Sequence, residues 1–322
     1  MSVPDDPLRE KTDTIIRTAS TRMNRCGYSI KGLRKRGNVY RHVRVYEWDL
    51  YTLNAMFVIN SHDELKDLIA DTKKRIVNIR KNNTQMISAF DTAVTEGRVY
   101  GEVCDDGLLV YVSQNTFTDV YYYWKRDALL PIITGIVKPV ISCTVRAGSA
   151  DDEEKFLLSS GFELYRTNVQ VKAEIKSKYT DNIYSSDYAV ITKDTKEYYD
   201  QAAALWEEYL DQFDVPFEHL HPNDNHHLIC AVNQNNKVIG VHWWQNHGRT
   251  SEGRHTAVSA DCRKKGIASS LIKQWLCDAG SAGALNAETW ICTENCNSLH
   301  VYSRAGFTMN QRIAKQYTPS NY

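Results

Sequence analysis

The sequence predicts an α/β fold in two domains, each built around a mixed sheet flanked by helices. Short β-rich apolar runs alternate with amphipathic helical stretches. Two kinds of passage, a hairpin and a helix ending at Gly-Phe, occur once in each half of the chain. The length of 322 residues suits two domains of ordinary size.

The bulk composition is that of a folded, soluble chain. Hydrophobic residues make up 42% and charged residues 24%, which excludes a disordered protein. The 39 basic and 39 acidic residues cancel, which argues against nucleic acid as the main partner. Residues 1–45 nevertheless carry eleven Lys and Arg against four acids, a net +7. We interpret this segment as a solvated face or arm, with an anion-binding patch as the alternative.

The cysteines and the apolar stretches indicate where the protein resides. None of the eight cysteines forms a Cys-x-x-Cys pair, and no matching pair completes a zinc set with Cys292 and Cys296. We therefore expect no metal, and mostly buried thiols in a reduced compartment. The start, MSVPDDPLRE, has no apolar signal core, and Leu129–Ile141 is too short and too broken to span a bilayer. These features predict a cytoplasmic protein without membrane contact.

The two hairpins lie at Glu102–Gln114 and Ala231–Gln245, offset by 129 residues. The two helices that end at Gly-Phe lie in Glu153–Val169 and Ser298–Ala314, offset by 145. The second half therefore carries about sixteen extra residues between its hairpin and its Gly-Phe, enough for a loop and a short helix. Hairpins and capped helices are common, so independent origin is the alternative to duplication.

The polar stretch Glu174–Asp187 marks the predicted boundary, giving domains 1–178 and 179–322. In the second domain the pattern predicts alternating strands and helices around a mixed sheet. The expected order is a strand (Ala189–Thr192), a helix (Thr195–Phe213), the hairpin, a strand (Arg254–Val258), a helix (Gly266–Ala279), a strand (Ala287–Cys292), a helix (Asn297–Ala305) and a final strand.

The extra passage in the second half is Val258–Leu276, VSADCRKKGIASSLIKQWL. Gly266 and Ala268 are small enough to let a ligand approach the backbone closely. The first amides of the following helix lack internal partners and, with the helix dipole, form an anion site. Lys264 and Lys265 add positive charge, so the turn suits a pyrophosphate. A plain helix start is the alternative. The apolar face of this helix comprises Ile267, Leu271, Ile272, Trp275 and Leu276.

The order Arg-x-x-Gly-x-Ala at Arg263–Ala268 is neither a Walker A loop nor GxGxxG. It resembles motif A of the GNAT superfamily of N-acetyltransferases. Downstream, N-x-x-S-x-x-x-Y-x-x-x-G-F at Asn295–Phe307 resembles the family's motif B. The chain is therefore identified as a member of the GNAT superfamily in a tandem arrangement, which implies acetyl-CoA as its co-substrate. The resemblance implies two GNAT-like domains, each with a mixed, mostly antiparallel twisted sheet.

The resemblance also implies roles. The backbone of Val258 and Ala260 would pair with the pantetheine arm, and the amides from Lys264 to Ser269 would hold the pyrophosphate. Tyr302 would protonate the departing thiolate, as a phenol with an ordinary pKa near 10 can; core packing is the alternative role. Ala260 departs from the proline that the family often has there. The cofactor-binding residues implied are Val258, Ser259, Ala260, Arg263, Lys264, Lys265, Gly266, Ile267, Ala268, Ser269 and Asn295.

The proton of the attacking amine needs an acceptor. Glu288 lies two residues from the family's usual base position, which falls at Trp290, and so shares a strand face with it. His255, preceded by Glu252, lies on the strand that enters motif A and has a suitable ordinary pKa. Both are candidate bases, and an ordinary polar surface role is the alternative for each.

The acceptor cleft should be lined by the helix Thr195–Phe213, the loop after it and the hairpin. That loop holds four histidines in Asp214–His227, which we expect to be exposed rather than metal-binding. Trp243 and Trp244 are candidates for lining the pocket, although neighbours on a strand face opposite sides, so core packing is expected for one of them.

The first half lacks the cofactor motif. After Thr118–Asp127 the chain runs into ALLPII, and the counterpart of Tyr302 is Leu157. The half therefore resembles a degenerate copy of the active domain. The leading hypothesis is an N-acetyltransferase for a small-molecule or peptide amine. The alternatives are a non-catalytic acyl-CoA-binding or scaffold module, and an acetyltransferase for a nucleic-acid-associated target.

Overall fold

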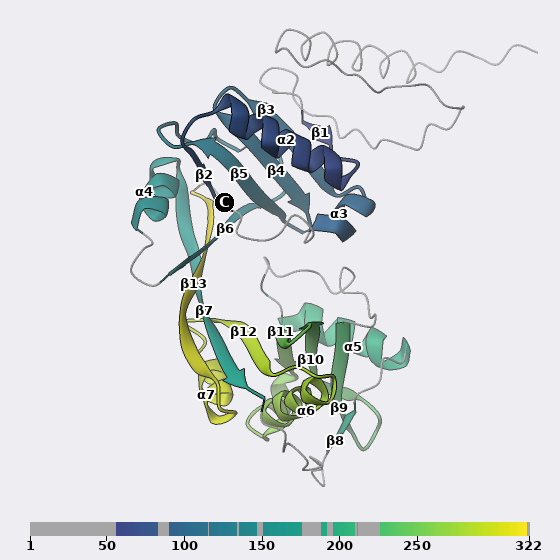
Figure 1. Cartoon of the computed structure of the whole chain (residues 1–322). Helices are drawn as coiled ribbons and strands as arrows, with labels where there is room; N and C mark the ends of the chain where they lie inside the picture. Colours follow the sequence, from purple (N-terminus) through teal and green to yellow (C-terminus); the bar gives the residue numbers. More distant parts are fainter. Residues whose placement is uncertain are drawn as a thin grey trace, which may run out of the picture. The chain divides into compact units, whose positions relative to one another are not determined.

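The computed structural model describes residues 56–82, 90–114, 116–133, 135–146, 151–175, 188–191, 196–209, 211 and 226–320. Residues 57–322 form one compact unit (Figure 1). The basic segment 1–45 and the loop at 212–225 lie outside the described residues, so the interpretations placed on them stay predictions.

The described residues alternate strands and helices in both halves, as the sequence predicts. The first half holds β1 (Phe57–Val58), α2 (His62–Arg75), β2 (Ile79–Lys81), α3 (Asp91–Thr95), β3 (Val99–Cys104), β4 (Gly107–Ser113), β5 (Thr118–Lys125), β6 (Pro139–Arg146), α4 (Asp151–Ser159) and β7 (Phe162–Glu174). The second holds β8 (Tyr188–Ile191), α5 (Lys196–Tyr209), β9 (His226–Asn233), β10 (Val238–His247), β11 (Thr250–Val258), the 3₁₀ turn η3 (Ala260–Cys262), α6 (Ile267–Ser281), β12 (Asn286–Cys292), α7 (Cys296–Arg304) and β13 (Thr308–Pro319).

The strands join in the order β1-β3-β4-β5-β6-β13-β7-β12-β11-β10-β9-β8, with β2 paired to β5. Two neighbouring pairs, β5–β6 and β11–β12, are parallel, and the other described pairs are antiparallel. The predicted mixed, mostly antiparallel pairing is confirmed, but the strands form one continuous sheet rather than a separate sheet in each of two domains. Each parallel pair occupies the same place in its half, following the hairpin.

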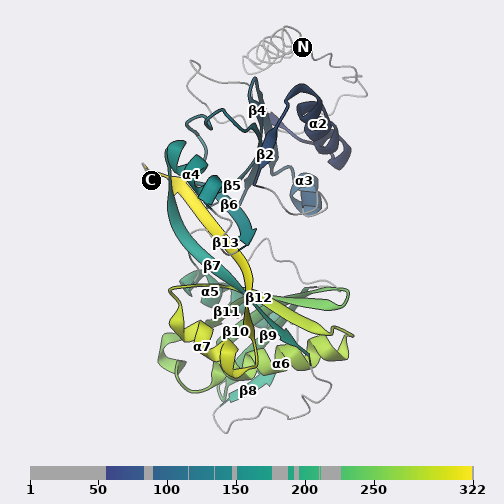
Figure 2. The same ribbon diagram turned by 60° about the vertical axis from the view of Figure 1, so that its left-hand side comes forward.

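The last strands of the two halves are exchanged. β7 lies between β12 and β13, so residues 168–174 of the first half complete the sheet of the second. β13 in turn pairs with β6 through residues 312–317 (Figure 2). Strands from the two sides of the predicted boundary at 178/179 therefore hydrogen-bond to each other. Sequence patterns do not reveal this pairing.

The halves differ where the sequence predicts extra residues. In the second half α6 connects the parallel strands β11 and β12, whereas the described residues between β5 and β6 contain no helix. Both hairpins form as predicted. In the second, the Asn233 side-chain oxygen accepts hydrogen bonds from the amides of Asn235 and Lys237, and Asn236 takes a left-handed φ of 59°.

Two cores cover the faces of the second half's sheet. The predicted apolar face of α6 is confirmed: Leu271, Trp275 and Leu276 are fully buried against the sheet and α7. Burying a Leu or Ile side chain contributes about 1.5–3 kcal/mol. The opposite face packs on α5, mainly through Trp206 and Trp243. Trp244 belongs to the α6 core, so both tryptophans of the hairpin are buried core residues, whereas the sequence predicts core packing for only one of them.

The cysteines only partly follow expectation. The seven described cysteines are free thiols, but only Cys143 and Cys230 are buried; the other five are partly or fully exposed. Within the described residues no cluster of metal-ligating side chains is found, and no helix is both long and apolar enough to cross a membrane.

Candidate functional site

The turn between β11 and α6 is built from unusual backbone conformations. The 3₁₀ turn η3 follows β11, and α6 begins directly after Gly266. Gly266 has φ 84° and Lys264 has φ 63°, both in the left-handed region that favours glycine. This conformation explains why a glycine stands at 266.

No side chain caps the N-terminus of α6, whereas Ser61 caps α2 and Asn295 caps α7. The first intrahelical bond runs from the Ser270 amide to the Gly266 carbonyl at 3.0 Å. The amides of residues 267–269 therefore start the helix without helical acceptors. Residues 263–266 are exposed, so the charges of Arg263, Lys264 and Lys265 face solvent at the start of this helix, and the anion site stays a prediction.

β11 and β12 separate beside this turn. Their parallel pairing covers three positions, from Thr250–Asn286 to Glu252–Glu288, and both strands then continue. On its other side β11 contains a bulge, because Trp243 pairs with His255 and Trp244 with Gly253, leaving Arg254 without a cross-strand partner position. The result is a pair of diverging strands at the end of the sheet nearest α6.

The backbone groups implied for pantetheine are used within the chain. The Ala260 amide donates to the Tyr209 hydroxyl at 2.9 Å, and Arg263 Nε donates to the Val258 carbonyl at 3.1 Å. The Arg263 guanidinium also lies 4.6 Å from the Tyr209 ring centre. Ser259 is likewise engaged, its amide donating to Ile239. The sequence indicated neither the hydrogen bond to Tyr209 nor that from Arg263.

The Tyr302 phenol lies between the diverging strands. It is only 6% exposed, and its oxygen is 3.2 Å from Thr256 Oγ1 on β11. Burial raises the pKa of Tyr302 to about 12, although hydrogen bonds with Thr256 and Thr289 act to lower this pKa. Thr289 belongs to β12, so the phenol contacts both strands. The group is protonated at neutral pH, as an acid must be.

The two candidate bases lie on the opposite face from Tyr302. His255 packs edge-on against Trp206 of α5, with ring centres 4.8 Å apart. Glu288 alternates with the core residues Ala287 and Thr289, and its carboxylate pairs with Lys172 of β7 at 2.7 Å. The predicted acid and the predicted bases thus approach the diverging strands from the two sides of the sheet.

Asn295 has a local structural role. Its side-chain oxygen accepts from the Ser298 amide at 3.0 Å and caps α7. The asparagine of motif B therefore begins the helix that carries Tyr302. The direct cofactor contact implied by the resemblance stays a prediction.

Residues 188–307 match the family model described as "Acetyltransferase (GNAT) family". The stretch contains the diverging strands, the uncapped α6 and Tyr302. Residues 188–307 form a GNAT acetyltransferase domain.

Solved structures share the fold of this GNAT domain and of strands and helices beyond it. One is a GCN5-related N-acetyltransferase from Sphaerobacter thermophilus, with TM-score 0.50 and 12% identity over 69% of this chain and 80% of that one. A Drosophila protein has a TM-score of 0.52 and 11% identity, over 83% of this chain and 99% of that one. A tandem GNAT protein from the clavulanic acid biosynthesis pathway has a TM-score of 0.51 and 11% identity, over 82% of this chain and 98% of that one. At such identities they show a GNAT-like α/β fold alone. The search of curated proteins finds no match.

The GNAT domain also contains a partly buried polar group whose importance the sequence did not indicate. The Glu252 carboxylate, beside Glu288 in the parallel pair, accepts from Gln245 at 2.9 Å and pairs with His247 and Arg254. Burial alone would raise the pKa of Glu252, but Arg254, His247 and Gln245 together bring it below its ordinary value. Two carboxylates thus occupy neighbouring positions on the α5 face.

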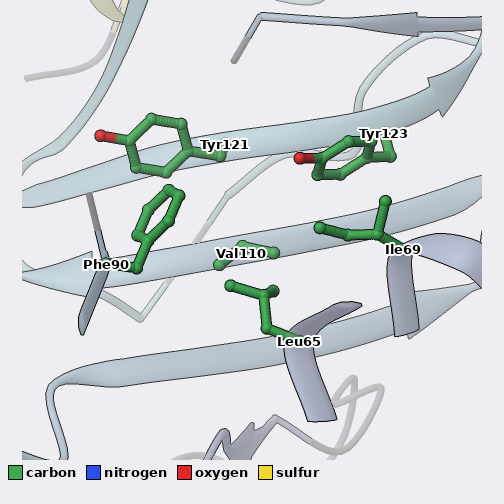
Figure 3. Close-up of a pocket in the computed structure, with 6 residues that line it drawn as sticks. All are labelled: Leu65, Ile69, Phe90, Val110, Tyr121 and Tyr123. Atoms are coloured by element: carbon green, nitrogen blue, oxygen red, sulfur yellow. The ribbon is translucent and has the colours of Figure 1, made fainter. Parts of the chain in front are cut away.

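A crevice outside the GNAT domain carries no comparable chemistry. It lies between α2, β4 and β5, and its lining is apolar except for two phenol oxygens (Figure 3). Its residues are Leu65, Ile69, Phe90, Val110, Tyr121 and Tyr123. Phe90 and Tyr121 meet edge-on at 4.9 Å, which is typical of core packing.

Proposed function

We propose that the protein is an acetyl-CoA-dependent N-acetyltransferase that acts on a primary amine of a small molecule or peptide. Transfer would occur by direct attack in a ternary complex. The observation that carries the proposal is the position of the Tyr302 phenol, which reaches both diverging strands of a GNAT domain beside an uncapped helix.

The residues of the turn fit the phosphates of acetyl-CoA. Gly266 has no side chain, and an added Cβ would have only the Tyr188 hydroxyl within 4 Å, at 3.8 Å, so a bulky group can approach. Lys264 and Lys265 supply charge beside the free amides. A pantetheine arm pairing with Val258 and Ala260 would displace Tyr209 and Arg263 from those groups.

Acetyl-CoA, when bound, supplies a thioester whose carbonyl carbon accepts a nucleophile. As the amine nitrogen bonds to this carbon, the carbon–sulfur bond breaks. Tyr302 donates its phenol proton to the departing sulfur, and a base on the α5 face takes the amine proton. Glu288 or His255 would serve as that base, directly or through water.

A cationic acceptor would exchange with cations already paired to the carboxylates of the α5 face. Glu252 and Glu288 are adjacent in the parallel pair, and the lowered pKa of Glu252 keeps it ionised at neutral pH. A protonated primary amine is attracted to such a pair before it loses its proton. Lys172 and Arg254 balance these charges, so an incoming ammonium would compete with them.

We also propose that residues 1–178 contain a degenerate copy of the catalytic domain at 179–322. The matched hairpins and the matched parallel pairs support the duplication. Leu157, which stands where the second half has Tyr302, is fully buried and offers no acid. The copy would provide β7 to the catalytic sheet.

Calorimetric titration with acetyl-CoA and an amine panel assayed for acetylation test the proposal. We expect one acetyl-CoA per chain and acetylation of at least one amine class. Binding without acetylation would favour the non-catalytic alternative, and two bound molecules would contradict the degenerate copy.

A further inference from the structure

A hydrogen-bonded chain of two buried side chains, His242 and Tyr302, runs through the half-buried Thr256. His242 Nδ1 lies 2.8 Å from Thr256 Oγ1, which lies 3.2 Å from the Tyr302 oxygen. His242 and Thr256 are cross-strand neighbours of β10 and β11, and Tyr302 comes from α7. No resemblance or motif pointed to His242 or Thr256.

The histidine at the start of this chain is neutral. His242 is fully buried, and burial together with the nearby His255 lowers its pKa to about 3, although a hydrogen bond with the backbone of His255 raises it. A neutral imidazole carries one proton, on one of its two nitrogens. The nitrogen that carries it decides what His242 can donate.

Proton counting sets the direction of the hydrogen bonds. If Tyr302 gives its hydrogen to sulfur, its oxygen must accept from the threonines rather than donate to them. A hydroxyl has one hydrogen, so a Thr256 that donates to Tyr302 must itself accept from His242. That acceptance requires the hydrogen of His242 on Nδ1, and leaves Nε2, which has no hydrogen-bond partner among the residues that the structure describes, as an unprotonated lone pair.

The imidazole is held tightly in place. Its ring centre is 4.8 Å from that of Trp275, and an added Cβ at Gly253 would come within 3.1 Å of its Cε1 atom and 2.9 Å of the Trp275 ring. Because Gly253, on the neighbouring strand β11, has no side chain, it leaves the space that the two rings occupy.

We infer that His242 is a positioning residue which, through Thr256, directs the Tyr302 hydrogen toward the departing sulfur. The inference rests on the proposed function, with Tyr302 as the acid. It deepens that function by assigning the buried His242 and the half-buried Thr256 to the control of one proton.

The protonated nitrogen can be identified without catalysis. Long-range ¹H–¹⁵N correlation spectra of the full-length protein distinguish the two neutral forms, and His242→Asn identifies the signal. We expect hydrogen on Nδ1. Hydrogen on Nε2 would overturn the inference. Hydrogen on Nδ1 in a protein that acetylates no amine would contradict the proposed function and leave the hydrogen-bond direction standing.

A double-mutant cycle tests the link to Tyr302. Thr256→Val removes the hydroxyl at nearly constant volume and should lower kcat about tenfold, the worth of one hydrogen bond at a charge-developing group, with the acetyl-CoA KM within twofold. Thr256→Ser, which keeps a donor, should restore most of kcat. In a Tyr302→Phe background Thr256→Val should have no further effect.

The same comparison applies to His242. Asparagine places an amide donor near Nδ1, whereas phenylalanine keeps only the ring. We expect His242→Asn to retain more of kcat than His242→Phe.

Two results of the Thr256 cycle would overturn the inference and show a merely structural role. One is an equal loss of kcat from Thr256→Val in the parental and the Tyr302→Phe backgrounds. The other is a Thr256→Ser protein as impaired as Thr256→Val.

Discussion

The hydroxyl of Tyr209 accepts a hydrogen bond from the amide of Ala260 at 2.9 Å, at the place where the chain turns from β11 toward α6. Tyr209 is the last residue of α5, and its ring also contacts Arg263 at 4.6 Å. A side chain of one helix thus occupies a backbone group that the GNAT resemblance assigns to the co-substrate.

Tyr209→Phe should tighten acetyl-CoA binding. The substitution keeps the ring against Arg263 but frees the Ala260 amide, so binding no longer breaks that hydrogen bond. A bond of this kind is worth about 0.5–1.5 kcal/mol, which corresponds to a roughly two- to tenfold lower Kd by calorimetry. Tyr198→Phe, on the same helix but bonded to Asn236, is the control and should leave Kd unchanged. Weaker binding by Tyr209→Phe would show that the hydroxyl belongs to the site.

Gly266→Ala should abolish most of the thermal stabilisation by acetyl-CoA. A non-glycine residue at φ 84° is strained by about 1 kcal/mol, and the turn would relax away from the conformation that presents its amides. Gly283→Ala is the matched control: it has φ 89°, also has open space, and lies at the far end of α6. Melting temperatures with and without acetyl-CoA check this. An equal ligand-induced rise in both variants would refute the pyrophosphate site.

Tyr302→Phe should lower turnover by about 10²–10⁴, the usual contribution of a positioned acid. The ring still packs edge-on against Phe307, so folding and the acetyl-CoA Kd should change little. Steady-state kinetics and calorimetry separate the two effects. Tyr317 is also buried but lies on β13, and Tyr317→Phe should leave turnover unchanged. Parental turnover in Tyr302→Phe would exclude it as the acid.

His242 should make the folded protein less stable in acid. The pKa of His242 is about 3 in the folded protein, whereas the ordinary value for a histidine is 6.5. Between these two pH values the unfolded chain therefore binds a proton that the folded protein does not. The free energy of unfolding therefore falls as pH drops from 6.5 toward 3, by up to about 1.4 kcal/mol per pH unit. In His242→Asn this slope should decrease by that amount in urea titrations. An unchanged slope in His242→Asn would contradict the prediction.

A fragment of residues 176–322 should be poorly soluble and inactive. It lacks β7, so β12 and β13 lose their shared neighbour and the α6 core loses Val169, Val171 and Ala173. A fragment of residues 160–322 keeps β7 and should be clearly more soluble. Size-exclusion chromatography compares them. A soluble, fully active 176–322 fragment would show that the first half has an independent task.

Much of the fold follows from local patterns along the chain. The spacing of Leu271, Trp275 and Leu276 predicts the buried face of α6, and the two apolar runs of Ala231–Gln245 predict the second hairpin, because both patterns depend on residues a few positions apart. Gly266 and Tyr302 stand out for the same reason, since each belongs to a short motif whose spacing is written in the sequence.

The contacts that control the site depend on which strands become neighbours. Alternation tells which face of β11 carries Thr256, but only the pairing of β10 with β11 and the packing of α7 bring it to His242 and Tyr302. Likewise, β7 and β13 read as the ends of separate halves until the sheet joins them. Sequence alone thus determined the local elements and the motif residues. The tertiary structure decided their partners, because hydrogen bonds between distant strands leave no local periodicity to detect.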